Sequence, residues 1–151
     1  IGKIGIPDSV LTKNGPLTGA EYDLIKQHPI IGVNILEQTS FFHAELPLIL
    51  HHHERYDGMG YPEGLASQKI PLGARILHIT DSIEAMLARR TYKEPYSLAK
   101  VISELHRCSG AQFDPMVTQI AIKNLQSGSL HQVLTSPEET PSEKTLVVST
   151  A

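Results

Sequence analysis

Apolar residues recur along most of the chain at the three- and four-residue spacing that gives an α-helix one apolar face. The spacing predicts helices over residues 19–27, 29–37, 45–53, 72–88, 97–107 and 115–125. Thr18 precedes Glu21 by three residues, the pattern of a capping box, and Ser97 stands at the capping position of a later helix. Because no strand pattern alternates with these helices, the sequence predicts an all-α fold.

Two segments interrupt the helical pattern. Residues 54–72 are rich in glycine, proline and polar groups, which predicts an ordered loop. From residue 127 onward Ser, Thr, Pro and Glu predominate, and no aromatic residue occurs. We therefore expect one domain over residues 1–126 and a flexible, low-complexity tail over residues 127–151, in which only residues 145–148 have the character of a short strand.

Composition and charge narrow the function classes. The hydrophobic share of 40% and the charged share of 19% are typical of a soluble globular domain. The net charge of −3 gives no general attraction for nucleic acid polymers, and no apolar run is long enough to span a bilayer. A single cysteine, Cys108, excludes an intrachain disulfide and fits a reducing compartment. The chain begins at Ile1 without a visible signal peptide, and we expect it to be a piece of a longer protein.

The densest chemistry lies at residues 51–62, where three adjacent histidines precede Glu54 and a glycine-rich turn ending in Tyr61 and Pro62. Imidazole is the commonest metal ligand in proteins, and a neighbouring carboxylate widens the choice of divalent ion. Consecutive helical residues point about 100° apart, so the three histidines can serve different metals or one metal and a neighbour of its ligands. Such a run can also be a weak adventitious metal patch.

Two further residues extend the candidate site. His28 stands at a predicted helix boundary, and Asp81 lies inside an apolar helix. A carboxylate on a buried helix face must be paired, protonated or metal-bound, so an ion pair with Arg75 or Arg90 is the structural alternative.

Histidines and aspartates on facing helices could hold two close divalent metals. Such a pair supplies the charge neutralisation, the hydroxide and the in-line geometry that phosphodiester hydrolysis requires. Lys3, Arg90 and Lys93 could add fixed positive charge for the phosphate, which the acidic balance of the chain otherwise repels.

Taken together, the motifs resemble the HD-GYP family over residues 1–125. Residues 52–62 match its HHExxDGxGYP signature at every fixed position. The other matching segments are residues 1–7, like the continuation of a His-Asp-x-Gly-Lys motif, residues 28–32, like His-Pro-x-x-Gly, residues 70–77 with Asp81, and residues 112–115.

The resemblance implies an HD-type helical bundle, of which this chain holds the C-terminal portion. It implies a bacterial cytoplasmic phosphodiesterase that hydrolyses the second messenger cyclic di-GMP to linear pGpG or GMP. It also implies two or three divalent metals, Fe or Mn first, with Zn and Ni as alternatives. The implied metal ligands are His28, His52, His53 and Asp81, and the implied substrate contacts are Lys3 (also catalytic), Gly60, Tyr61, Pro62, Arg90 and Lys93.

The family also implies partners: diguanylate cyclase (GGDEF) domains at the loop, and an upstream regulatory domain such as a response-regulator receiver. Its His-Asp pair would stand just before Ile1, so we expect this chain alone to bind metal weakly and to have little or no hydrolase activity. The alternatives are a non-catalytic module that senses nucleotide or contacts a cyclase domain, and an HD phosphohydrolase for another nucleotide.

Two of the histidines outside the implied ligand set stand close to its members in the sequence. His51 precedes the signature pair and would have a structural role or support a ligand. His78 stands one turn before Asp81, where the family has a small or apolar residue. A packed histidine is the favoured interpretation of His78, and a partner to the ligands is the alternative.

Overall fold

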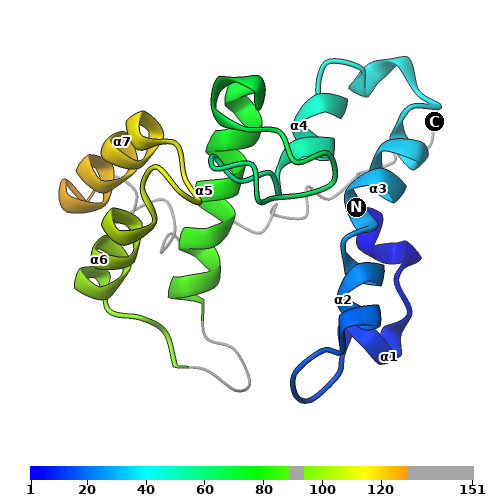
Figure 1. Cartoon of the computed structure of the whole chain (residues 1–151), viewed down its shortest axis with the longest axis horizontal. Coiled ribbons are helices and arrows are strands. Elements are labelled where there is room, and N and C mark those ends of the chain that lie inside the picture. Colours follow the sequence, from blue (N-terminus) through cyan, green and yellow to red (C-terminus); the bar gives the residue numbers. More distant parts are fainter. Residues whose placement is uncertain (89–93, 129–151) are drawn as a thin grey trace, which may run out of the picture.

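The computed structural model describes residues 1–88 and 94–128, which form helices and loops without a named strand (Figure 1). The α-helices are α1 (Asp8–Leu11), α2 (Gly19–Ile25), α3 (His28–Leu36), α4 (Leu46–His51), α5 (Leu72–Leu87), α6 (Leu98–Cys108) and α7 (Pro115–Gln126), and the 3-10 turns are η1 (Gly2–Gly5), η2 (Ser40–Phe42) and η3 (Ser67–Lys69). The predicted all-α class is confirmed. Arg90, Lys93 and most of the predicted tail, with its strand at residues 145–148, lie outside the described residues.

The elements pack in sequence order across the molecule. The turn η1 lies on α3, α3 on α4, and α4 on α5, while α6 and α7 pack on the other side of α5 and on each other (Figure 1). None of the described helices is both long and apolar enough to cross a bilayer. Because α5 contacts α4 as well as α6 and α7, it connects the part of the molecule that holds His28, His52 and His53 to the part that holds the hydrophobic core.

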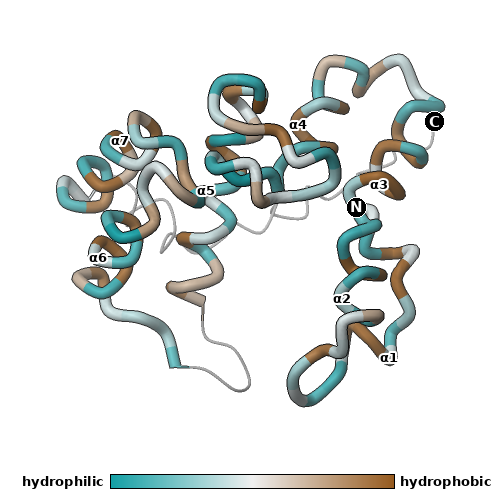
Figure 2. Tube along the Cα trace, viewed as in Figure 1, coloured by the Kyte–Doolittle hydropathy of each residue, from teal (hydrophilic) through white to brown (hydrophobic). Residues whose placement is uncertain are grey.

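The hydrophobic core lies where α5, α6 and α7 meet. Val101 and Leu105 of α6 are fully buried, as their helical spacing predicts. Hydrophobic and hydrophilic positions alternate around both α6 and α7, as a helix with one covered face requires (Figure 2). The buried members of this cluster are Ile79, Ile83, Val101, Leu105, Phe113, Val117, Ala121, Ile122 and Leu125.

Local signals set most helix starts. At α2 the Thr18 hydroxyl accepts the backbone N–H of Glu21, and the Glu21 carboxylate accepts the backbone N–H of Thr18, so the predicted capping box is present. Helix α4, by contrast, ends at His51, two residues earlier than its apolar pattern predicts. The backbone turns there because the N–H of Glu54 donates to the carbonyl of His51, and the Glu54 side chain is buried beneath the following loop.

Asp114 ties the start of α7 to α5. One carboxylate oxygen caps α7 by accepting the backbone N–H groups of Met116 and Val117, and the other forms an ion pair with Arg75 of α5. The Arg75 Nε also donates to the carbonyl of Ile70. One buried carboxylate thus caps the start of α7 and neutralises a partly buried guanidinium, which fixes the position of residues 109–114 beside α5.

We predict that Asp114→Ala lowers the free energy of unfolding by about 3–5 kcal/mol, because it removes the cap and leaves the Arg75 charge without its partner. Ser97→Ala is the matched control, since Ser97 caps α6 through one exposed hydrogen bond and should cost about 1 kcal/mol. Urea unfolding measures both variants, and equal small losses would contradict this role of Asp114.

Candidate metal centre

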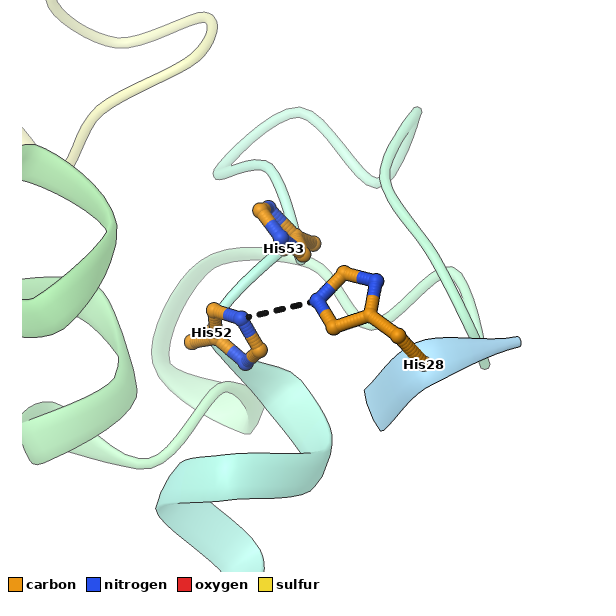
Figure 3. A group of neighbouring side chains, drawn as sticks. All are labelled: His28, His52 and His53. Carbon is orange, nitrogen blue, oxygen red and sulfur yellow. Dashed lines mark hydrogen bonds between the residues drawn. The ribbon is translucent and has the colours of Figure 1, made fainter. Parts of the chain in front are cut away.

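Three imidazoles from two helix ends meet at one point of the structure. His28 is the first residue of α3, and His52 and His53 directly follow α4 (Figure 3). One nitrogen of each ring lies within 4.8 Å of one nitrogen of each of the other two. The packing of α3 on α4 therefore brings together residues 24 positions apart.

Hydrogen bonds to backbone fix the ring nitrogen that His28 and His52 can offer to a metal. The Nδ1 of His28 lies 2.7 Å from the carbonyl oxygen of Ile25, the last residue of α2, and the Nδ1 of His52 lies 2.6 Å from that of Ile49 in α4. A carbonyl can only accept, so each Nδ1 carries the proton and each neutral ring keeps a lone pair on Nε2. Metal-ligating histidines commonly donate their second ring N–H in this way.

The two free nitrogens face each other. The Nε2 of His28 lies 3.3 Å from the Nε2 of His52 (Figure 3). Two nitrogen ligands at about 2.1 Å from one ion, at ordinary coordination angles, lie roughly 3.0–3.4 Å apart. Two lone pairs at this distance repel each other unless a cation or a proton lies between them. The donor set therefore fits a divalent metal ion.

His53 completes the group with a different support. Its ring stacks on Tyr61, with centroids 4.9 Å apart and an interplanar angle of 28°. Burial, with help from the neighbouring imidazoles, lowers the pKa of His53 to about 3. Burial also lowers the pKa of His28 and of His52, although their bonds to backbone carbonyls act in the opposite direction. All three rings are thus neutral at neutral pH, which is the form that binds metal.

The loop after the histidines folds back on them. A Cβ on Gly60 would lie 2.3 Å from the backbone nitrogen of Arg55 and 2.6 Å from the Cα of Glu54, so only glycine fits. The N–H of Tyr61 donates to the carbonyl of His53 at 3.3 Å. The buried Glu54 carboxylate accepts the backbone N–H groups of Glu63 and Gly64. These contacts place Tyr61 over His53.

Lys3 and Asp81 line the same pocket as the three histidines. Lys3 is there because Gly2 touches α3 directly: a Cβ on Gly2 would lie 1.7 Å from the carbonyl oxygen of His28. The positive charge of Lys3 contributes to the lowered pKa of His28, and the Asp81 carboxylate opposes the lowering at His52. The pocket thus places the charge of Lys3 and the carboxylate of Asp81 beside the imidazoles.

Two expectations about Asp81 are corrected. Asp81 is exposed, so its place on an apolar helix does not mean that the carboxylate is buried. Arg75, one of its two possible ion-pair partners, binds Asp114 instead, and Arg90, the other, lies outside the described residues. The helical pattern of α5 identified apolar residues but not which of its faces other elements cover. Asp81 as a metal ligand stays a prediction.

The remaining predicted residues divide into three groups. Tyr61 borders His53, with Gly60 and Pro62 in the same loop, whereas Arg90 and Lys93 lie outside the described residues. His51 is buried, with its Nδ1 3.9 Å from a Glu54 oxygen, in keeping with a structural role. Sequence reasoning missed the close approach at Gly2, and it treated Glu54 as a carboxylate near the metal, whereas the Glu54 side chain binds the loop backbone and lies outside the converging set.

Comparison with known proteins identifies the family. Residues 1–117 match the family described as HD domain. The chain belongs to the HD domain family. It is 42% identical over 125 residues to a cyclic di-GMP phosphodiesterase of Thermotoga maritima, covering 82% of this chain and 34% of that protein. It is 45% identical over 117 residues to the cyclic di-GMP phosphodiesterase response regulator RpfG of Xanthomonas campestris, covering 76% and 31%.

A solved structure has the same fold. The HD domain described here superposes on a crystal structure of cyclic GMP-AMP specific phosphodiesterases of Vibrio cholerae with a TM-score of 0.61 at 18% identity, covering 90% of this chain and 35% of that one. The chain thus spans about a third of the length of the relatives it matches. The predicted family and fold are confirmed.

We predict that Gly60→Ala lowers the free energy of unfolding by about 2 kcal/mol, because the added methyl forces the loop away from the backbone of residues 53–55. Gly19→Ala is the matched control, since its Cβ would meet no atom within 4 Å. Chemical unfolding compares the two variants, and equal stabilities would show that the loop tolerates a side chain at residue 60.

We predict that the metal-free HD domain loses stability as the pH falls from 7 to 5. The pKa values of His28, His52 and His53 are lowered in the folded state, so the unfolded chain binds more protons below about pH 6.5. The stabilisation from neutral imidazole is present above this pH and is lost below it. Urea unfolding across the range should show a smaller loss for His53→Phe than for the parent, and a flat parent profile would contradict the prediction.

Proposed function

We propose that this HD domain is the metal-binding part of a phosphodiesterase that hydrolyses cyclic di-GMP to linear pGpG or GMP in bacterial signalling. The observation that carries the proposal is the pair of imidazoles whose Nε2 atoms face each other at 3.3 Å, with both Nδ1 atoms bound to backbone carbonyls. Two named cyclic di-GMP phosphodiesterases that share 42% and 45% identity with this chain support the choice of substrate.

The side chains that line the pocket would have two roles, metal binding and phosphate binding. His28, His52 and His53 would hold a divalent metal, and Asp81 would add an oxygen ligand from the same pocket. When bound, the metal supplies positive charge at the phosphate and a hydroxide at neutral pH. Lys3, at the pocket wall, would pair with a phosphate oxygen.

The loop at Gly60, Tyr61 and Pro62 would form the side of the pocket that the nucleotide approaches, because it lies over His53. Arg90 and Lys93 remain proposed phosphate contacts on sequence grounds. The same loop is a proposed contact for a GGDEF domain, and a receiver is the proposed upstream partner.

The proposed metals are Fe or Mn, with Zn and Ni as alternatives, because imidazole and carboxylate ligands accept all four. Within the described residues, the set that converges within 4.8 Å holds three imidazoles and no carboxylate. A site with two or three metals needs bridging oxygen ligands beyond this set. We therefore propose that residues 1–151 alone bind metal weakly and hydrolyse substrate slowly or not at all.

Turnover of cyclic di-GMP tests the proposal, with Fe(II) or Mn(II) supplied to this chain extended by its upstream coding sequence. We expect measurable hydrolysis that His52→Ala lowers at least about 100-fold, because the facing pair of nitrogens is lost. His43→Ala is the control, since His43 is exposed and lies outside the pocket.

Other outcomes would favour the alternatives. Binding of cyclic di-GMP without turnover would favour a non-catalytic sensing module, and faster cleavage of another cyclic dinucleotide would favour a different substrate. Equal activity of residues 1–151 and the extended chain would contradict the proposed weakness of this chain alone.

A further inference from the structure

A histidine on α5 is buried behind the candidate metal centre. His78 lies on α5, one turn before Asp81, and its side chain is covered on all but a small part of its surface. Its ring centroid lies 5.3 Å from that of Phe113 and 6.3 Å from that of His53. It does not belong to the set of converging ligand atoms. The ring therefore lies between the core and the metal-binding segment.

Both nitrogens of His78 have partners, and these partners fix its proton. The Nδ1 lies 2.8 Å from the backbone oxygen of His52, so it must donate. The Nε2 lies 3.2 Å from the side-chain nitrogen of Gln112, so it must accept. A neutral imidazole with its proton on Nδ1 satisfies both contacts. The result is a row of hydrogen bonds from Gln112 through His78 to His52.

Gln112, at one end of this row of hydrogen bonds, is itself held in place. The backbone carbonyl of Gln112 accepts the N–H of Tyr56, and the carbonyl of Ala111 accepts the N–H of Asp57. Two residues later, Asp114 is bound to Arg75 and to the start of α7. Gln112 is therefore anchored on both sides, and it can present its amide to His78 from a fixed position.

At the other end of this row of hydrogen bonds, His78 binds the peptide group between His52 and His53. The carbonyl of His52 follows the end of α4, where backbone oxygens lack partners within the helix. Among the described residues, the imidazole of His53 has no hydrogen bond, so its direction depends on its backbone and on contacts with the neighbouring rings, of which Tyr61 stacks on it. A contact that fixes the His52 carbonyl also fixes the peptide plane from which His53 projects.

We infer that His78 is a positioning residue of the metal centre, which holds the His52–His53 peptide in the orientation that directs both imidazoles at one ion. The inference rests on the proposed metal centre. It assigns a role to a side chain on α5 that ligates nothing itself. The hydrogen bond, rather than the volume of the ring, is the feature that acts on the ligands.

Zn²⁺ binding to the whole chain, measured by titration calorimetry, tests this inference. The His52→Ala variant is the control that measures Zn²⁺ binding elsewhere on the chain. His78→Phe keeps an aromatic ring without a donor, and we expect it to lower Zn²⁺ affinity by about 10–100-fold. His78→Asn keeps a donor near the position of Nδ1 and should stay within about threefold of the parent. Co²⁺ absorption spectra should differ from the parent for His78→Phe and match it for His78→Asn.

The outcomes separate the inference from the proposal beneath it. A parent chain that binds Zn²⁺ no better than His52→Ala would overturn the metal centre and the inference together. The inference alone would be overturned if His78→Phe bound Zn²⁺ as tightly as the parent. It would also be overturned if His78→Asn lost as much Zn²⁺ affinity as His78→Phe. If His78→Phe fails to unfold cooperatively, Gln112→Met decides, because it leaves the imidazole in place without its Nε2 partner. A several-fold loss there supports the inference, and an unchanged affinity overturns it.

Discussion

The candidate site depends on two hydrogen bonds from histidine side chains to backbone carbonyls. Each of these bonds also satisfies a carbonyl at the C-terminal end of a helix. The Nδ1 of His28 satisfies the carbonyl of the last residue of α2, and the Nδ1 of His52 satisfies a carbonyl in the last turn of α4. Each bond leaves an unprotonated Nε2 on the opposite side of its ring. The interactions that end these helices therefore also leave the Nε2 of both rings available to a metal ion.

The rest of the structure brings these two helix ends together and keeps them there. Gly2 and Gly60 permit backbone approaches that no side chain would allow, one beneath His28 and the other beneath the loop that covers His53. The core of α5, α6 and α7 lies away from the pocket, yet it reaches the pocket through α5 and through residues 111–114. Stability and ligand geometry thus share contacts, so changes in the core can reach the metal centre.

Features carried by local sequence were predictable, and features that depend on distant contacts were not. The capping box at Thr18 and the inward face of α6 follow from residues close in the chain. The early end of α4 depends on a loop that packs against it later in the sequence. The motifs predict His28, His52 and His53 as ligands, and the structure brings the three rings together and adds the tautomers of His28 and His52. The hydrogen bond between His78 and Gln112 joins residues 34 positions apart, so no local sequence pattern predicts it.

Anomalous diffraction from metal-soaked crystals of this chain is the most direct test of the central claim, that His28 and His52 offer Nε2 to one ion. The account predicts a single strong peak about 2.1 Å from the Nε2 of both residues, with each Nδ1 still bound to its backbone carbonyl. A peak at Nδ1 of either ring, or at histidines outside this pocket with none between the two, would contradict it.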